Sequence, residues 1–197
     1  MVSIVFAGVG GQGLITAANL VGKAAVIEGK NVLMTELHGM AQRGGSILVE
    51  VRIGDYKSAI IPLGMADVIV GFEKLETARN LPKLKKGGTI LLNERRIHPI
   101  SLTIKKESYP DLAIEERMKD HSAIKVEADQ VALDLDNKRV VNTVMTGALF
   151  STGLLGISEE SLLAAIRESF PEKLWEANFK AFEAGKKLSQ VQTTRIS

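Results

Sequence analysis

Hydrophobic residues in the first half of the chain occur in short runs that alternate with a helical pattern. Residues 3–9 (SIVFAGV) and 66–72 (ADVIVGF) are short, apolar and rich in β-branched residues, which is typical of buried strands. Residues 14–29 place apolar side chains three and four positions apart, as on one face of a helix. Residues 31–36 (NVLMTE) then predict a second strand. A strand–helix–strand unit of this length has room for a right-handed crossover between parallel strands.

The middle of the chain predicts further strands and one hairpin. Residues 46–53 alternate between apolar and more polar positions, and a turn at Gly54-Asp55 predicts a partner strand over 57–62. Residues 73–84 have a helical pattern that is broken or ends near Pro82, because proline disrupts a helix interior. The remaining expected elements are strands over 87–94, 101–107 and 123–129 and a helix over 111–120.

The last third of the chain is expected to be helical. Residues 137–156 form one helical stretch that stops at Gly153 or Gly156. Ser158 is placed to cap the next helix, whose first turn is acidic. A final helix, ending near 185–187, carries an aromatic face that predicts internal packing, with docking of a partner as the alternative: Trp175, Phe179 and Phe182.

These elements predict a single domain over residues 1–197, with an α/β core over about 1–136 and a helical C-terminal part over about 137–190. The predicted fold class is α/β, a three-layer Rossmann-like arrangement whose sheet is mixed and partly parallel. We find no internal repeat and no low-complexity tract that would suggest a second unit.

The composition excludes several classes of site. The 197 residues include no cysteine, so this chain cannot form a disulfide, supply a thiolate nucleophile or ligate zinc or an iron–sulfur cluster through cysteine. With 25 Lys and Arg against 23 Asp and Glu, the formal net charge is +2. No basic stripe predicts binding to nucleic acid, and the run Lys83–Lys86 is interpreted as a solvated helix end. Neither His98 nor His121 has the spacing of a metal ligand, so no metal is expected.

We expect neither a targeting segment nor a membrane span. The first residues are strand-like and lack a basic n-region. No apolar stretch approaches the 18 residues or so that a membrane-spanning helix requires. The cytoplasm is therefore the expected compartment.

The glycine-rich sequence GVGGQG, residues 8–13, lies between the first strand and the first helix. In this position glycines permit a tight turn, a close approach by a phosphate and tight packing of the helix on the strand. The N-terminus of the helix also offers free N–H groups to an anion. Glu36 ends the second strand near the place of a ribose-binding acid, so a dinucleotide site is one interpretation. An ordinary strand-to-helix turn that tolerates glycine is the other.

A second glycine-bearing loop, HGMAQRGG over residues 38–45, follows the second strand and carries Gln42 and Arg43, with Ser46 directly after it. Because ligand sites in open α/β sheets form at the carboxyl ends of the strands, we expect both loops to face one crevice. The two loops then form a surface for an anion or a polar cofactor rather than a ribose pocket. Arg43 is the residue expected to contact an anion, with a structural role in an interface as the alternative.

Two further polar residues each have two interpretations. His38 could act as a catalytic acid or base, but one histidine in a polar loop more often serves as a hydrogen-bonding scaffold. Glu73 could line the same crevice, although an acid at the N-terminus of the next helix is the favoured interpretation.

The segments GVGGQG, HGMAQRGG, VRIG and IIPLGMADVIVGFE together resemble the small (beta) subunits of indolepyruvate ferredoxin oxidoreductases. These correspond to the gamma subunit or domain of the 2-oxoacid:ferredoxin oxidoreductases. The resemblance covers residues 1–156 and extends more loosely through the C-terminal helices. HGMAQRGG is its most specific part and is similar to the arylpyruvate branch, since the pyruvate and 2-oxoglutarate branches have loops nearer to GPERRGA or GPEARGG.

The resemblance implies that the chain is one subunit of an enzyme and is inactive alone. Such complexes oxidatively decarboxylate an arylpyruvate with coenzyme A to arylacetyl-CoA and carbon dioxide, and they reduce ferredoxin. Thiamine diphosphate and [4Fe-4S] clusters are expected on a large (alpha) partner subunit in a heterotetramer, with no cofactor bound by this chain alone. This chain would wall the channel for coenzyme A or the oxoacid through ten candidate residues: Gly8, Gly10, Gly11, Gln12, Gly13, His38, Gln42, Arg43, Gly44 and Gly45.

Three alternatives stay open at this point. The chain could be the gamma subunit of a pyruvate or 2-oxoglutarate type oxidoreductase. It could be a free-standing dinucleotide-binding oxidoreductase that uses Glu36. It could also be a non-catalytic scaffold that only stabilises its partner.

Overall fold

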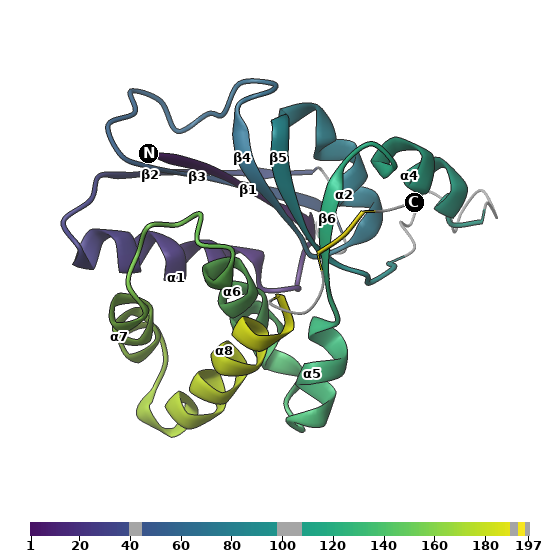
Figure 1. Cartoon of the computed structure of the whole chain (residues 1–197). Helices are drawn as coiled ribbons and strands as arrows, with labels where there is room; N and C mark the ends of the chain where they lie inside the picture. Colours follow the sequence, from purple (N-terminus) through teal and green to yellow (C-terminus); the bar gives the residue numbers. More distant parts are fainter. Residues whose placement is uncertain (40–44, 98–107, 190–192, 196–197) are drawn as a thin grey trace.

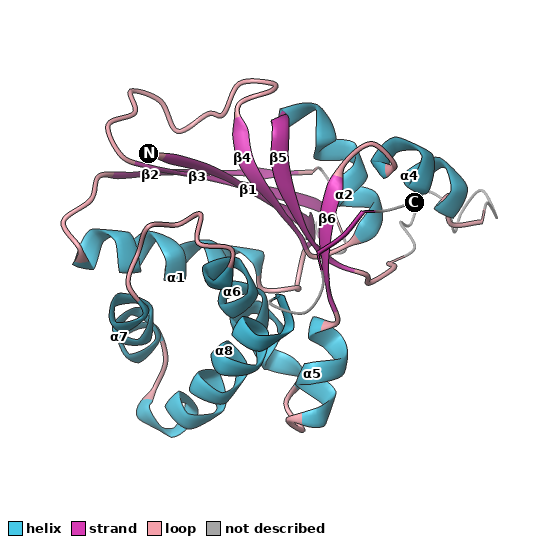
Figure 2. Cartoon of the chain, in the orientation of Figure 1, coloured by secondary structure: helices cyan, strands magenta, loops and turns pink. Residues whose placement is uncertain are grey.

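The computed structural model describes residues 1–39, 45–97, 108–189 and 193–195. Within these ranges seven strands form one mixed sheet in the order β2-β3-β1-β4-β5-β6-β7 (Figure 2). β1, β4, β5 and β6 are parallel, β3 is antiparallel to both β1 and β2, and β7 is antiparallel to β6. The expected α/β fold with a mixed, partly parallel sheet is therefore confirmed. The strands are β1 (Val2–Val9), β2 (Val32–His38), β3 (Ser46–Ile53), β4 (Ala66–Gly71), β5 (Leu84–Asn93), β6 (Ser122–Val126) and β7 (Thr193–Arg195).

Helices pack on both faces of the sheet, as a three-layer fold requires (Figure 1). Alternation along β1 explains this: Ile4 and Phe6 face the layer of α1, whereas Val5 and Ala7 face the layer of α2 and α4. α5, α6, α7 and α8 share the face of α1. The α-helices are α1 (Leu14–Ile27), α2 (Lys74–Asn80), α4 (Asp111–Met118), α5 (Ala128–Asp134), α6 (Val141–Ser151), α7 (Glu159–Ser169) and α8 (Trp175–Ser189). The described residues also include short 3₁₀ turns at η1 (Leu81–Lys83), η2 (Lys138–Val140) and η3 (Glu172–Leu174).

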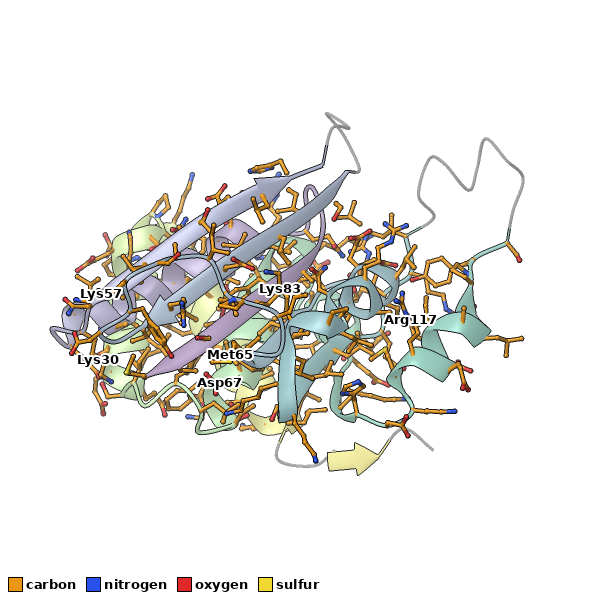
Figure 3. All side chains as sticks on the ribbon, turned by 90° about the horizontal axis from the view of Figure 1, so that it is seen from above. Lys30, Lys57, Met65, Asp67, Lys83 and Arg117 are labelled. Carbon is orange, nitrogen blue, oxygen red and sulfur yellow. The ribbon has the colours of Figure 1, made fainter. Side chains whose placement is uncertain are left out.

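The predicted hairpin between residues 46–53 and 57–62 is wrong. β3 pairs with β2 along one edge and with β1 along the other, so neither edge is open to a further strand. Residues 54–65 instead cross the face of the sheet. Arg52 donates from Nη1 to the Ser58 carbonyl oxygen at 3.2 Å, and the Ile61 N–H donates to Oε2 of Glu50 at 3.0 Å. Figure 3 shows this segment, which carries Lys57 and Met65, passing over the strands.

Contrary to the sequence prediction, Lys83 is not part of a solvated helix end. Its ammonium forms an ion pair with the carboxylate of Glu50, which is fully buried on β3, and also donates to the Ile61 carbonyl oxygen at 2.8 Å. A buried carboxylate needs such a partner, because leaving its charge unpaired is strongly destabilising. Lys85 and Lys86 are exposed, as expected, but they belong to the first residues of β5.

The middle segments follow their predicted pattern where the structure describes them. The helical pattern over 73–84 divides into α2 and the 3₁₀ turn η1, which contains Pro82. β5 and α4 occupy the positions expected of a strand and a helix. The strand expected over 123–129 is correct only as far as Val126, because residues 128–129 begin the helix α5, which the sequence did not predict. The strand expected over 101–107 lies outside the described residues.

The C-terminal helices confirm the packing interpretation of the aromatic face. Phe182 is fully buried, with its ring 5.6 Å from that of Phe150, and the Trp175 indole N–H donates to the Phe170 carbonyl oxygen at 2.8 Å. α6 and α8 cross closely, because a Cβ added at Gly147 would lie 2.1 Å from the backbone oxygen of Phe182. α8 continues past the expected end to Ser189.

The predicted helix ends in this region are also confirmed. α6 stops at Ser151, two residues before Gly153, whose φ of +70° lies in the left-handed region. Ser158 caps α7 by accepting a hydrogen bond from the Ser161 N–H at 3.2 Å. No helix in the described ranges combines the length and the apolarity that a membrane crossing requires.

Candidate functional site

The GVGGQG turn places the N-terminus of α1 at the carboxyl end of β1. Gly11 has a φ of +93°, and Gly13, the N-cap of α1, has a φ of +82°. Both values lie in the left-handed region that favours glycine. A Cβ added at Gly13 would lie 3.0 Å from the Cβ of Asn142 on α6, so this position also lets α1 and α6 approach each other. These conformations fit the tight turn that the sequence predicts.

The Gln12 side chain hydrogen-bonds to backbone groups on both sides of the turn. Its Oε1 accepts from the Val9 N–H at 2.7 Å, and its Nε2 donates to the Phe72 carbonyl oxygen at 2.8 Å. Because a Cβ added at Gly8 would lie 2.6 Å from Oε1 of Gln12, Gly8 leaves room for this carboxamide. Gln12 and Gly8 therefore shape the turn, and the Gln12 carboxamide is already committed to the protein.

The two glycine-rich loops touch each other. The Gly10 N–H donates to the Gly45 carbonyl oxygen at 3.0 Å, and the Gly39 N–H donates to the Ser46 carbonyl oxygen at 2.8 Å. β1 and β2 end at the same edge of the sheet, because both are antiparallel to β3. The expected proximity of the two loops is thus present in the backbone. Gln42, Arg43 and Gly44 lie outside the described residues.

His38 and Glu36 lie together on the edge strand β2. Nε2 of His38 is 3.2 Å from Oε2 of Glu36, and both residues are exposed. In the sheet His38 pairs with Ile47 of β3, which pairs in turn with Gly8 of β1. Two strand spacings, about 10 Å, therefore separate His38 from the turn. His38 lies beside the turn and does not enter it.

A shallow pocket of about 300 Å³ opens at the N-terminus of α1. No side chain of the described residues caps this helix end, and its first turn contains no acidic residue. The free N–H groups and the positive end of the helix dipole favour a negatively charged group at such a position. Of the described residues that line the pocket, only Thr16 has a polar side chain. The lining residues are Gly11, Gly13, Leu14, Ile15, Thr16 and Ile47.

The strand order does not match a dinucleotide site. In that arrangement an acid at the end of the adjacent parallel strand reads the ribose beside the glycine turn. Here the antiparallel strand β3 separates β1 from β2, and Glu36 contacts His38 on the edge strand. The interpretation of Glu36 as a ribose-binding acid is therefore corrected by the topology.

Glu73 caps α2 from inside the protein. Its Oε2 accepts from the Glu76 N–H at 2.8 Å, and its Oε1 accepts from the Ile97 N–H at 3.2 Å and from the Tyr109 hydroxyl. Burial of Tyr109 and its hydrogen bond to the Glu73 carboxylate raise the pKa of this tyrosine. Because Glu73 is 1% exposed, it does not line an open crevice. Its favoured interpretation as an acid at a helix N-terminus is confirmed.

Other polar residues brace the same edge of the sheet, and sequence reasoning missed their role. Ser46 donates from Oγ to Oε2 of Glu76 at 2.6 Å, which joins the start of β3 to α2. Asn93 donates from Nδ2 to Oδ2 of Asp129 at 2.8 Å, which joins the end of β5 to α5. The signal that could have found them is a polar residue at the boundary of an apolar strand.

Within the described ranges, no three His, Asp or Glu side chains come together as metal ligands. His121 lies just after α4, and its backbone N–H bonds to the Met118 carbonyl oxygen. His98 lies outside the described residues.

Comparison with known proteins shows similarity along nearly the whole chain. The family model described as "Pyruvate ferredoxin/flavodoxin oxidoreductase" matches residues 3–188. The indolepyruvate oxidoreductase subunit IorB of Methanothermobacter thermautotrophicus is 39% identical over 188 residues, which cover 93% of this chain and 95% of that protein. The pyruvate/ketoisovalerate oxidoreductases common subunit gamma of Thermococcus litoralis is 32% identical over 185 residues, with 92% and 93% covered.

The fold is also similar to that of a solved structure. The gamma subunit of the keto/oxoacid ferredoxin oxidoreductase from Geobacter sulfurreducens superimposes with a TM-score of 0.73 at 26% identity. The match covers 98% of this chain and 100% of that one. Since the family model and the relatives both extend over more than nine-tenths of the sequence, the chain belongs to the pyruvate ferredoxin/flavodoxin oxidoreductase family.

Proposed function

We propose that the chain is the small subunit of an indolepyruvate (arylpyruvate):ferredoxin oxidoreductase. The observation that carries this proposal is the 39% identity to an indolepyruvate oxidoreductase subunit over 93% of the chain. The pyruvate/ketoisovalerate gamma subunit has a lower identity of 32% over a similar length. The HGMAQRGG loop over residues 38–45 supports the same branch. The gamma subunit of a pyruvate or 2-oxoglutarate type enzyme is the second candidate.

In the proposed reaction an arylpyruvate and coenzyme A give arylacetyl-CoA and carbon dioxide, and two electrons leave singly to two ferredoxins. Thiamine diphosphate would supply the carbanion chemistry, and iron–sulfur clusters would carry the electrons. We assign both to a large partner subunit, because this chain has no cysteine to ligate a cluster. The proposed assembly is a heterotetramer in which this chain alone is inactive.

The part of this chain in that reaction is to wall the channel for coenzyme A or the oxoacid. The uncapped N-terminus of α1 and the contact between Gly10 and Gly45 support this role, since they form one glycine-lined surface with a positive helix end. Gln12 would keep the surface in shape through its two backbone hydrogen bonds. The proposed wall comprises Gly8, Gly10, Gly11, Gln12, Gly13, His38, Gln42, Arg43, Gly44 and Gly45.

The direct test is co-expression with a candidate large (alpha) subunit, followed by assay of ferredoxin reduction. We expect turnover that requires both chains, coenzyme A and indolepyruvate, with much weaker turnover of pyruvate and 2-oxoglutarate. Preference for pyruvate or 2-oxoglutarate would instead assign the chain to another branch of the family.

Two experiments address the remaining alternatives. Titration of the isolated chain with NAD(H), NADP(H) and FAD is expected to give no dissociation constant below about 100 μM, which corresponds to about −5.5 kcal/mol. Tighter binding would support the free-standing dinucleotide-binding enzyme. A pure scaffold would be indicated if variants of both glycine-rich loops assembled with the partner and turned over normally.

A further inference from the structure

A second pocket lies on the opposite face of the sheet from α1. It has a volume of about 490 Å³ and lies between α4, the first residue of α2 and the carboxyl ends of β5 and β6. Figure 2 shows α4 and α2 beside these strands, away from α1. Its lining residues are Lys74, Leu92, Glu94, Leu112, Ile114, Glu115, Glu116, Met118, Lys119 and Lys125.

Lys74 is the unusual member of this lining. Its side chain is only 10% exposed, and its ammonium makes no hydrogen bond to any residue in the described ranges. The ion pair it does form is long, with Nζ 3.8 Å from Oδ1 of Asp111, an oxygen that Arg96 approaches more closely at 3.0 Å. Removing an ammonium from water is unfavourable unless hydrogen bonds replace its hydration. Nζ of Lys74 is not one of the fully buried polar atoms without a partner, so water still reaches it; its long ion pair with Asp111 leaves donor capacity that an anion can use.

The other two lysines of the pocket are already matched with carboxylates. Lys119 forms an ion pair with Glu116, and Nζ of Lys125 lies 3.1 Å from Oε1 of Glu94. Both lysines are also more exposed than Lys74, so water hydrates them. An incoming anion would gain most at Lys74.

The rest of the lining is apolar where it is buried. Leu92, Ile114 and Met118 are each at most 2% exposed, and they belong to the core under α4. Leu112 on α4 is 83% exposed, so its side chain stands largely in solvent at the pocket. A ligand that fits this surface has one negative charge for Lys74 and an apolar body for these side chains.

We propose that this pocket binds a small carboxylate with an apolar tail, with the carboxylate at Lys74 and the tail against Leu112, above the buried Leu92, Ile114 and Met118. The proposal is independent of the proposed function, because it rests on the opposite face of the sheet and concerns the chain by itself. Failure of the binding test below leaves the oxidoreductase assay unaffected, and the reverse also holds.

The test is calorimetric or ligand-observed NMR titration of the full chain with phenylacetate as the probe. We expect saturable binding with a dissociation constant of about 1 mM, the range in which a ten-atom ligand with modest efficiency binds. The neutral alcohol 2-phenylethanol has a similar body without the charge and is expected to bind about 10-fold more weakly, since a charge-assisted contact is lost.

Lys74→Met removes the ammonium while keeping most of the length of the side chain. We expect about 10-fold weaker binding of phenylacetate and unchanged binding of 2-phenylethanol. The variant is expected to fold, because replacing a buried charge by an apolar group of similar volume is often tolerated and Asp111 keeps Arg96. Lys180→Met is the matched control, since Lys180 is an exposed lysine on α8 outside the pocket and is expected to leave the titration unchanged.

Leu112→Ala keeps the test decisive if Lys74→Met fails to fold. Because Leu112 is mostly exposed, its truncation should preserve the fold and weaken phenylacetate by about 3-fold through lost apolar contact. Equal binding of phenylacetate and 2-phenylethanol, or an unchanged affinity in a folded Lys74→Met variant, would overturn the proposal. Loss of assembly with the large subunit in Lys74→Met, without any phenylacetate binding by the parent chain, would overturn it in favour of a socket for the partner.

Discussion

The side-chain amide of Gln12 donates to the carbonyl oxygen of Phe72 at 2.8 Å, across 60 residues of sequence. Together with the hydrogen bond from the Val9 N–H to Oε1 of Gln12, this contact joins the carboxyl ends of the parallel strands β1 and β4. The residue that a motif search would assign to a ligand loop is thus a connector within the sheet edge.

Gln12→Ala is expected to lower the free energy of unfolding by about 2 kcal/mol, because it removes two hydrogen bonds and leaves the Val9 N–H without this acceptor. For a chain of this size that corresponds to a decrease in Tm of about 4–8 °C. Urea and thermal unfolding measure both quantities. Gln130→Ala is the control, since Gln130 is on α5 and bonds only to the exposed Asp134 in the described structure; it should change stability by less than about 0.5 kcal/mol. Equal destabilisation by the two variants would contradict the role given to Gln12.

The glycines of the turn are expected to differ sharply from one another. Gly13→Ala should destabilise by about 1–2 kcal/mol, because Gly13 has a φ of +82° and an added Cβ would meet Asn142 at 3.0 Å. Gly10→Ala is the matched comparison, since Gly10 is not among the positive-φ glycines and its added Cβ would lie 3.5 Å from Ile47, an ordinary contact. It should be neutral or slightly stabilising. Thermal melting of the two variants side by side measures the difference. An equal loss of stability in Gly10→Ala and Gly13→Ala would contradict this explanation.

Glu28 predicts a dependence of stability on pH. The backbone hydrogen bond from Ser158, followed by the interaction with Lys30, lowers the pKa of Glu28 from 4.5 to about 2. Because the folded pKa lies below the unfolded one, this carboxylate stabilises the fold fully above about pH 4.5 and loses that effect as the pH falls toward 2. Glu28→Gln should therefore destabilise by about 1 kcal/mol at pH 7, with part of that effect screened by solvent, and by clearly less at pH 3.

Urea unfolding of the parent and Glu28→Gln at the two pH values measures this difference. Glu116→Gln is the control, because Glu116 is an exposed residue in an i,i+3 pair with Lys119. Such an exposed pair contributes little to stability. Glu116→Gln should therefore change the free energy of unfolding only slightly at both pH values. If Glu28→Gln lowered the free energy of unfolding equally at pH 7 and pH 3, the charge of Glu28 would not be what stabilises its contact with Ser158.

Arg43→Lys tests the proposed channel wall in the reconstituted complex. If Arg43 holds a phosphate of coenzyme A or the oxoacid carboxylate, its forked guanidinium can grip two oxygens and lysine cannot reproduce this. Losing this charge-assisted contact removes about 1.5–3 kcal/mol of binding free energy. We therefore expect kcat/KM to decrease about 10- to 150-fold, with folding and co-purification unchanged. Varying coenzyme A and indolepyruvate separately identifies the anion. Unchanged kinetics for both substrates would remove Arg43 from the site, and loss of assembly alone would assign it to the interface.

Much of the secondary structure could be predicted because it depends on local spacing. The strands near 3–9 and 66–72, the helix from Leu14 and the cap at Ser158 all follow from residues within a few positions of one another. The hairpin over 46–62 was wrong for the same reason, since local alternation does not say which strand will pair with β3. Once β1 and β2 occupy both its edges, residues 54–65 can only cross the face of the sheet.

The candidate site divides in the same way. The glycine turn and the position of both loops at one sheet edge could be predicted, because chain direction and the order of strand and turn are written in the sequence. The direction of the Gln12 and Glu73 side chains could not, because their partners lie on other elements. A polar side chain satisfies its hydrogen bonds with whichever group folding brings near.

The sequence by itself determined where most helices and strands form, which side of these strands is apolar, and that no cysteine of this chain can hold an iron–sulfur cluster. Only the tertiary structure decided that β3 separates β1 from β2, which removes Glu36 from any ribose beside the glycine turn. The tertiary structure alone also placed Lys74 beside the apolar residues of the pocket under α4, with its Nζ 3.8 Å from Oδ1 of Asp111. The physical reason is that backbone periodicity is set by neighbouring residues, whereas strand order and the pairing of buried charges arise from contacts between segments far apart in the chain.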